Sequence, residues 1–378
     1  MENILFAHDG YACIDENKIY SQEYTTGIIQ RYQKLGKNVT LLVREDNNIN
    51  KTKQNLIECE NIRLIPVINF KSIGTVKNNW IARKQIEEQV KDTDLLVARL
   101  PSSIGEYAIH YAKKYKKKYM VELVGCPWDS LTNYSMIGRV VAPYIFLKTR
   151  RLVREAKNVI YVTENFLQHR YPNNKNNIFL SDVELPDNED YKYKKEFNNK
   201  KIKIGTLGAI DVRYKGQEYV IRALGKLKKM GFNHIVYEMA GVGDSKRLEN
   251  IAKKYGVLDN ISFIGAIPHK DIYEWLDTID IYIQPSNQEG LSRALIEAMS
   301  RGCPCIASNA GGNVELIDEE FIFKKKNVRE LTAKIFEMMN NRDARIVQSE
   351  KNIIKTKKFA KKDLEKKRIE FYKKVLEG

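Results

Sequence analysis

The sequence predicts an α/β protein made of two doubly wound, Rossmann-like domains, and three observations lead to this fold class. The 378 residues are enough for two domains of ordinary size. Short β-branched runs alternate with helical periodicity in both halves. A polar stretch at residues 185–200 separates the halves and is the expected linker. We therefore expect a first domain at residues 1–184, a second at 201–358 and a final helix at 359–378.

The first half predicts a parallel sheet with helical crossovers. Its first strand is followed by a loop at His8-Asp9-Gly10 and a long polar connection. Strands are expected at residues 3–7, 39–43, 62–65, 94–98, 119–124 and 158–162, and helices at 24–36, 80–90 and 103–115. Ligands of such sheets bind beyond the carboxyl ends of the strands. Polar residues gather there, as in a site that accepts a hydroxyl-rich substrate. Gly10, Arg99 and Asp129 are therefore candidates for such an acceptor site.

The second half predicts another doubly wound domain. Strands are expected at residues 202–207, 235–240, 261–264 and 281–283, and helices at 216–229, 245–255 and 270–278. The last strand leads into a further helix, whose apolar residues follow the spacing of a helix packed on a sheet: Leu291, Ala294, Leu295, Ala298 and Met299. Glu289 is expected in the turn before this helix, and Glu297 on its flank, away from the apolar face.

The pattern from Pro285 to Pro304, P-S-N-x-E-G-x(6)-E-A-M-x-x-G-x-P, resembles the signature of GT4-type glycosyltransferases, the glycosyl transferases group 1. The resemblance implies the GT-B fold, in which two domains face a central cleft and the last helix crosses back to the first domain. It also implies a retaining transfer of a sugar from a UDP- or GDP-sugar to a hydroxyl of a saccharide or lipid-linked saccharide acceptor. Synthesis of a cell-envelope polysaccharide or glycan is the expected setting.

The resemblance assigns roles to several residues of this motif. Glu289 would face the transferred sugar, and Glu297 would accept hydrogen bonds from the ribose hydroxyls. Gly290 and Leu291 would present backbone N–H groups to the diphosphate at a helix N-terminus. No nucleophile or general base is assigned.

Two glycine turns after earlier strands complete the expected donor site. The turn that begins at Gly208 ends in Lys215, which would stabilise charge on the leaving diphosphate. Ala209 stands where the family has an arginine, and Arg213 is the candidate for the missing charge. The turn at Gly241 would let the backbone approach the donor.

The two glutamates have other interpretations. Glu297 alone would suggest an ion pair with Arg293, four residues earlier, on a helix surface. The acid and nucleophile of a glycosidase lie about 5–9.5 Å apart, whereas eight residues of helix rise about 12 Å. The spacing of Glu289 and Glu297 therefore favours transfer over hydrolysis.

The net charge of +16 suits an anionic partner. Residues 321–378 carry 18 Lys and Arg against 8 Asp and Glu, and residues 139–157 carry six basic residues against one acid. The latter segment fits either an amphipathic helix on an anionic membrane surface or an internal helix with a charged outer face. The alternatives to a transferase are a basic protein that binds nucleic acid or anionic lipid on a non-catalytic GT-B fold, or a sugar-nucleotide epimerase.

Neither a cofactor nor a metal is expected, and no nucleic-acid motif is present. The pair Asp92 and Asp94 precedes a strand instead of following one, and the five histidines lack ligand spacing. The five irregularly spaced cysteines, and a start without the features of a signal peptide, predict a cytoplasmic protein, with peripheral association at the inner face of the membrane as an option.

Overall fold

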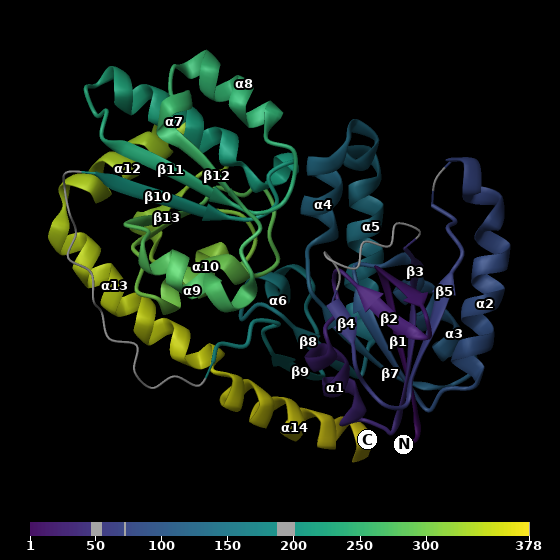
Figure 1. Ribbon diagram of the computed structural model, residues 1–378. Helices are drawn as coiled ribbons and strands as arrows, with labels where there is room; N and C mark the ends of the chain where they lie inside the picture. Colours follow the sequence, from purple (N-terminus) through teal and green to yellow (C-terminus); the bar gives the residue numbers. More distant parts are fainter. Residues whose placement is uncertain (47–54, 72, 187–200, 378) are drawn as a thin grey trace.

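The computed structural model describes residues 1–46, 55–71, 73–186 and 201–377. Figure 1 shows two α/β domains side by side, with the last helices running from the second domain back to the first. Most of the predicted linker, residues 187–200, lies outside the described residues.

The first domain is built on one sheet with a parallel core in the order β5-β3-β1-β6-β7-β8-β9. Its strands are β1 (Asn3–Asp15), β2 (Lys18–Ser21), β3 (Asn38–Glu45), β4 (Asn55–Ile57), β5 (Ile62–Val67), β6 (Leu95–Leu100), β7 (Lys118–Leu123), β8 (Asn158–Tyr161) and β9 (Asn176–Phe179). Its helices are α1 (Thr26–Gln33), α2 (Asn79–Lys91), α3 (Ser103–Lys114), α4 (Pro127–Tyr134), α5 (Met136–Glu155) and α6 (Phe166–Arg170).

The expected loop at His8-Asp9-Gly10 is wrong, because β1 continues through these residues to Asp15. The strand changes register between Ala7 and Tyr11 and then pairs with β2 in an antiparallel hairpin. Glu16 and Asn17 connect the two strands, both with positive φ, as hairpin turns of two residues require. Gln22 and Glu23, which follow the hairpin, line a cavity together with residues of the second domain.

The second domain has a six-stranded parallel sheet in the order β12-β11-β10-β13-β14-β15. Its strands are β10 (Ile202–Leu207), β11 (Ile235–Ala240), β12 (Ile261–Gly265), β13 (Ile281–Gln284), β14 (Cys305–Ser308) and β15 (Ile322–Phe323). Its helices are α7 (Gln217–Lys229), α8 (Lys246–Tyr255), α9 (Ile272–Asp277), α10 (Arg293–Ser300), α11 (Asn313–Leu316), α12 (Val328–Asn340) and α13 (Arg342–Thr356).

Helices cover both faces of both sheets, so inner strands such as β6, β8, β13 and β14 are buried along nearly their whole length. In β1, Leu5 packs with residues of α2 and α3, whereas Ile4 and Phe6 pack with residues of α1. In the second domain α7, α8 and α12 cover one face of the sheet, and α9 and α10 cover the other. The carboxyl ends of the strands are left to form the site.

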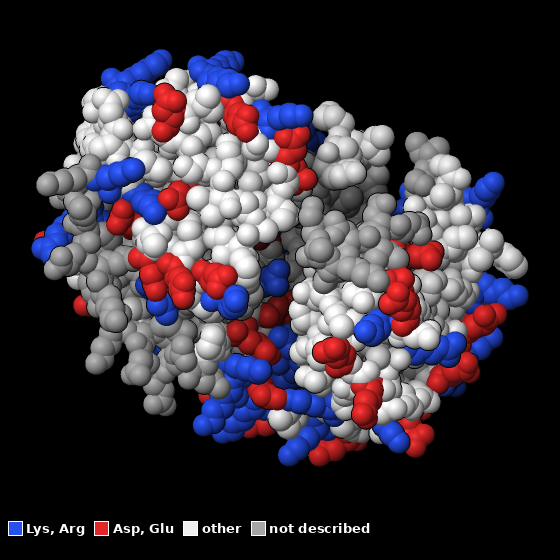
Figure 2. Space-filling view, in the orientation of Figure 1, with Lys and Arg blue, Asp and Glu red and all other residues white. Residues whose placement is uncertain are grey.

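The chain ends in α14 (Lys361–Glu377), which packs on the first domain. Its apolar side chains join the core around Ile4 and Phe6: Leu364, Phe371, Tyr372 and Val375. Figure 2 shows Lys and Arg gathered along the edge where α13 and α14 cross between the domains. Within the described ranges, no helix combines the length and apolar character that crossing a membrane requires.

Candidate active site

Lys215 and Glu289, 74 residues apart in sequence, form an ion pair in the second domain. The Lys215 ammonium lies 2.8 Å from Glu289 Oε1, and both side chains are largely shielded from solvent. Burial by itself would lower the pKa of Lys215, but the Glu289 carboxylate outweighs it, so the pKa is raised and the lysine is charged. The structure thus brings the two predicted catalytic residues into direct contact.

The Glu289 carboxylate is held by neutral donors as well. Ser286 Oγ donates to Glu289 Oε1 at 2.7 Å, and Gln284 Nε2 donates to the same oxygen at 3.1 Å. Ser286 is also tied to the end of β14, because the Ser308 hydroxyl donates to its carbonyl oxygen. Partners at the end of β13 therefore fix the orientation of the carboxylate before any ligand binds.

Gly216 allows the lysine turn to approach the glutamate turn. Its φ is +74°, and a Cβ at this position would lie 2.1 Å from the Pro285 carbonyl oxygen. The two turns are joined further by the Asn287 N–H, which donates to the Tyr214 carbonyl at 2.7 Å. A side chain at position 216 would force the turns apart and separate Lys215 from Glu289.

Glu297 lies on α10 and is buried, with only 9% of the residue exposed. The sequence pattern assigns Glu297 to a flank of the helix away from the apolar face, and the structure shows that the residue is buried there instead of exposed. Burial raises the pKa of Glu297 to about 7, and the charge of Arg293 opposes this shift. The carboxyl group changes its charge state near neutral pH, a property typical of functional positions.

The helix that follows Glu289 begins later than the motif suggests. Ser292 caps α10, its Oγ accepting a hydrogen bond from Leu295 N at 3.4 Å, and the helix begins at Arg293. Gly290 and Leu291 therefore lie directly before the N-cap of the helix, and their contact with a diphosphate stays a prediction. They are nevertheless placed between the domains, because a Cβ on Gly290 would lie 2.2 Å from the Val124 carbonyl oxygen.

The other donor-site glycines lie on neighbouring strand ends. A Cβ on Gly241 would lie 2.1 Å from the Gly208 carbonyl oxygen, so the turns after β10 and β11 are in backbone contact. Lys215 packs its aliphatic stem over Gly208. Arg213 lies two residues before Lys215 in a single 3-10 turn, and its side chain is exposed.

A cavity of about 510 Å³ lies at the domain interface. Its wall combines Gly290, Leu291 and Arg293 of the second domain with Glu23, Arg99 and Asp182 of the first. Figure 2 shows the surface hollowed between the two domains. Lys215 and Glu289 do not line this cavity, but Gly290, the residue after Glu289, does.

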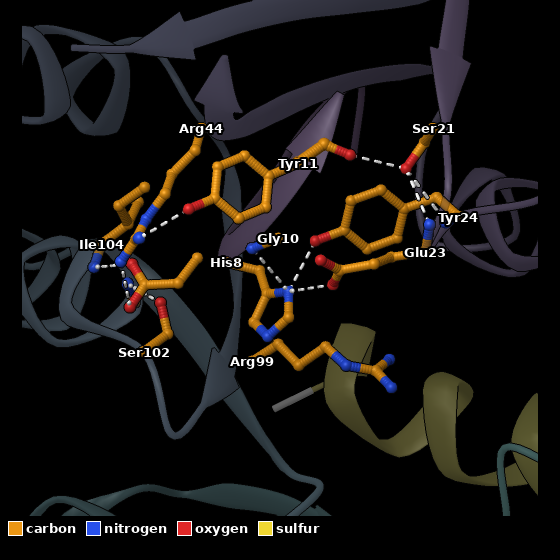
Figure 3. Close-up of polar contacts among 12 residues, drawn as sticks. His8, Gly10, Tyr11, Ser21, Glu23, Tyr24, Arg44, Arg99, Ser102 and Ile104 are labelled. Carbon is orange, nitrogen blue, oxygen red and sulfur yellow. Dashed lines mark hydrogen bonds and ion pairs between the residues drawn. The ribbon is translucent and has the colours of Figure 1, made fainter. Parts of the chain in front are cut away.

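Residues at the rim of the first domain interact mainly with one another, as Figure 3 shows. His8 Nδ1 lies 2.5 Å from the Tyr24 hydroxyl and accepts the Gly10 N–H at 3.1 Å. Burial, reinforced by the charge of Arg99, lowers the pKa of His8 to about 3, so the ring is neutral. Gly10 is tightly enclosed, since a Cβ there would lie 2.0 Å from the Tyr24 oxygen.

Asp9 has a structural role at this rim. Its carboxylate accepts the backbone N–H groups of Ser103 and Ile104 at 2.9 and 3.1 Å, at the N-terminus of α3. Arg44 and Lys71 pair with the same carboxylate. The backbone donors and the two cations lower the pKa of Asp9 although burial alone would raise it.

The two other acceptor-side candidates take part in ion pairs. Arg99 pairs with Asp182 and lies 3.4 Å from Glu122, while it also contributes to the cavity wall. Asp129 pairs with Arg170 at 3.4 Å and lies 3.9 Å from Lys325 of the second domain. Asp129 is thus placed away from the cavity wall that contains Arg99.

Most residues of the cavity wall were not predicted from the sequence, and three of these are charged: Glu23, Asp182 and Arg293. Glu23 follows a hairpin that was not predicted, and Asp182 follows the short strand β9, in which two of the four residues are asparagine. Arg293 was considered only as an ion-pair partner of Glu297. No motif singles out these residues, although Arg293 follows the predicted strand at residues 281–283, which was a usable signal; Asp182 follows a strand that was not predicted.

Comparison with known proteins identifies relatives across nearly the whole chain. The family described as glycosyl transferases group 1 matches residues 187–358. The Protein CapJ of Staphylococcus aureus is 33% identical over 363 residues, which cover 94% of this chain and 90% of CapJ.

Two solved structures share the architecture and confirm the predicted fold class. One is WaaG, a glycosyltransferase involved in lipopolysaccharide biosynthesis, with a TM-score of 0.64, 14% identity and coverage of 97% of this chain and 98% of WaaG. The other is Anabaena HepE in complex with UDP-glucose, with a TM-score of 0.66, 14% identity and coverage of 98% and 99%.

Proposed function

The chain belongs to the glycosyl transferases group 1, and we propose that it transfers a sugar from a nucleotide-sugar to an acceptor hydroxyl with retention of the anomeric configuration. One observation carries the proposal: the Lys215–Glu289 pair at 2.8 Å, joined through Gly290 to the cavity between the domains. This arrangement offers a cation for a leaving group and a carboxylate for a sugar at one place.

The leaving nucleoside diphosphate gains negative charge as its bond to the anomeric carbon breaks. The Lys215 ammonium, whose raised pKa keeps it charged, lies at the turn where that charge would develop. Glu289, held by Ser286 and Gln284, would accept hydrogen bonds from the sugar and orient it for attack. The reaction in this scheme needs no metal, and a chelator is expected to leave the rate unchanged.

Glu297 would bind the ribose, one helical segment away from Glu289. Its burial favours a single, well-defined partner, and its carboxylate form accepts two hydroxyl hydrogen bonds. Arg213 would supply the second cation in place of the arginine absent at Ala209, since it shares a turn with Lys215. Replacement of Arg213 by alanine is then expected to weaken nucleotide binding several-fold in calorimetry, whereas unchanged binding would remove Arg213 from the site.

The acceptor is a hydroxyl of a saccharide or a lipid-linked saccharide in polysaccharide synthesis. The similarity to WaaG, which is involved in lipopolysaccharide biosynthesis, supports this class of acceptor. The similarity to HepE, solved with UDP-glucose, supports a UDP-sugar as the donor. A lipid-linked acceptor would bring the enzyme to the inner face of the cytoplasmic membrane.

A thermal-shift screen with UDP, GDP and their sugars tests the proposal. A ligand that binds only the folded state raises the melting temperature as its concentration exceeds Kd. We expect one nucleoside diphosphate and its sugar to do so. No stabilisation by any of them, together with salt-sensitive binding to nucleic acid, would contradict the proposal and favour a basic binding protein.

A further inference from the structure

The outer face of the α4–α5 hairpin exposes an unusual number of large apolar side chains. They are Tyr134, Met136, Ile137, Val140, Tyr144 and Leu147, and their exposed fractions range from 63% for Leu147 to 88% for Tyr134. Single exposed apolar residues are common on protein surfaces, but a contiguous group marks a contact surface. This group lies within 14 consecutive residues.

The exposed residues of α5 form a regular stripe. Ile137, Val140, Tyr144 and Leu147 are separated by three or four residues, so they share one face of the helix. The buried residues of α5 lie on the opposite face, namely Gly138, Ala142, Thr149 and Val153. The helix is therefore anchored to the domain by one apolar face and presents a second one outward.

The inner face holds the hairpin in place without the outer stripe. A Cβ on Gly138 would lie 2.2 Å from the Leu131 carbonyl oxygen, so α4 and α5 are in backbone contact. Phe146 packs against the rings of Trp128 and Tyr171, and Lys148 pairs with Glu106 of α3 at 2.7 Å. Because these contacts fix the hairpin, the outer stripe is available for another function.

Basic residues follow the apolar stripe toward the C-terminal end of α5. The next positions at the same spacing are Arg151 and Arg154, and Arg150 is exposed beside them. The only acid on α5, Glu155, is bonded to Arg151 and Lys113. An apolar face flanked by arginines, with tyrosines among the apolar residues, has the composition of helices that lie in the headgroup region of a membrane.

The hairpin also lies beside the donor loop. Asn133 Nδ2 on α4 donates to the Asn287 carbonyl at 3.2 Å, and Gln288 Nε2 donates to Ser130 Oγ at 2.6 Å. Asn287 and Gln288 immediately precede Glu289. Figure 1 shows the hairpin projecting from the first domain next to the second. A surface bound to α5 would lie close to the loop that holds the sugar.

We propose that the outer face of α5, residues 136–154, docks on an anionic membrane surface and presents the cleft to a lipid-linked acceptor. The inference rests on the proposed function for the nature of the acceptor. The arginines favour anionic headgroups as the occupant, since each basic residue near such a surface strengthens binding. A second copy of the chain in a two-fold contact would bring the same arginines toward each other.

Co-sedimentation of the full chain with vesicles tests the docking surface. The vesicles contain phosphatidylcholine alone or with phosphatidylglycerol, at low and high salt. One variant places charges in the stripe, Val140→Asp with Leu147→Asp, and another removes flanking cations, Arg150→Gln with Arg154→Gln. The matched control is Ile354→Asp, because Ile354 is 64% exposed on α13 of the second domain.

We expect the wild type and Ile354→Asp to bind the anionic vesicles equally, and more weakly at high salt. The stripe variant is expected to bind at least tenfold more weakly, and the arginine variant several-fold more weakly. Equal binding by the stripe variant and the wild type, or no binding of the wild type to anionic vesicles, would overturn the proposal. A dimer in light scattering that the stripe variant dissociates, without vesicle binding, would overturn it in favour of a second copy.

A vesicle-free measurement separates this proposal from the proposed function. Each variant is tested for stabilisation by the nucleoside diphosphate that stabilises the wild type. Retained stabilisation shows that the donor site is folded, so that weaker vesicle binding by the stripe variant then supports the docking surface. If nothing stabilises the wild type but it still binds anionic vesicles through the stripe, the surface stands and the proposed function fails.

Discussion

Glu297 is the residue whose environment differs most from its place in the sequence pattern. The spacing of apolar residues in α10 assigns it to a flank, yet it is buried and its pKa is raised to about 7. In the unfolded chain a glutamate has an ordinary pKa of 4.5. Between these two values the folded state holds a proton that the unfolded state has lost, so Glu297 makes folding less favourable as the pH rises through this window.

Glu297→Gln removes this pH-dependent contribution. Relative to the wild type, the variant is expected to gain on the order of 2 kcal/mol in free energy of unfolding between pH 5 and pH 8. If Glu297 binds the ribose as proposed, the same variant should bind the nucleoside diphosphate more weakly, because an amide replaces the carboxylate that would accept the ribose hydroxyls. Urea unfolding at both pH values and calorimetry check the two effects. A pH-independent difference in stability would contradict the raised pKa.

At the scale of elements, the turns after β10 and β13 create the site by approaching each other. Gly216 is the residue that permits this approach, with its φ of +74° and no space for a side chain. The helices and strands around it only set the position of these turns. Because Lys215 is adjacent to Gly216, a side chain at position 216 is expected to lower the free energy of unfolding and to disrupt the Lys215–Glu289 ion pair together.

Gly216→Ala is expected to destabilise the protein by about 2 kcal/mol or more, since Cβ would meet the Pro285 carbonyl in a left-handed backbone conformation. Gly27→Ala is the matched control. Gly27 lies in α1, and the nearest contact of a Cβ there would be Thr25 Oγ1 at 4.0 Å. The control should gain up to about 1 kcal/mol from helix propensity. Equal effects of the two changes in thermal unfolding would refute the close approach.

The periodicity of the sequence predicts most elements of the second domain, because most of its strands are apolar and buried and each crossover helix has one apolar stripe. It fails at β1, where Gly10 suggested a loop although the strand continues through this residue to Asp15. Likewise, the apolar spacing of α10 does not reveal that Glu297 is buried, because the burial of a helix flank depends on segments outside the helix. Local pattern predicts which residues form an element, whereas the packing on its outer side depends on distant segments.

In the candidate site too, the residues of a local motif are predicted, whereas those brought in by distant segments are not. The resemblance to the family predicts that Glu289 and Lys215 act at the same donor site, and in the structure the two side chains are in contact. It does not predict Glu23 or Asp182 on the cavity wall, since they come from the other domain. Their positions depend on how the two domains are held together.

At the scale of the whole molecule, α14 connects the end of the chain to the first domain. Arg368, almost completely buried, lies 3.0 Å from Glu184, which also pairs with Arg31 of α1 at 2.8 Å. Asp182, two residues earlier, pairs with Arg99 of the cavity wall. The packing of α14 is thus linked to the acceptor side through a chain of ion pairs.

Phe371→Ala in α14 is expected to reduce the free energy of unfolding by about 3–5 kcal/mol, because the side chain is fully packed in the core of the first domain. Ile369→Ala on the same helix is the control, since Ile369 is 38% exposed. The control should cost much less. Chemical denaturation of both variants measures the difference, and a similar loss in each would show that α14 is not part of that core.

The central claim is that Lys215 stabilises the diphosphate leaving group beside Glu289. It is tested most directly by the rate of nucleoside diphosphate release from the donor that the thermal-shift screen selects. Lys215→Ala is compared with Lys229→Ala, an exposed lysine at the end of α7. We predict that Lys215→Ala lowers kcat by about 10²–10³, as for loss of one group that stabilises a developing anion, and that Lys229→Ala has no effect. An unchanged kcat in folded Lys215→Ala would contradict the account.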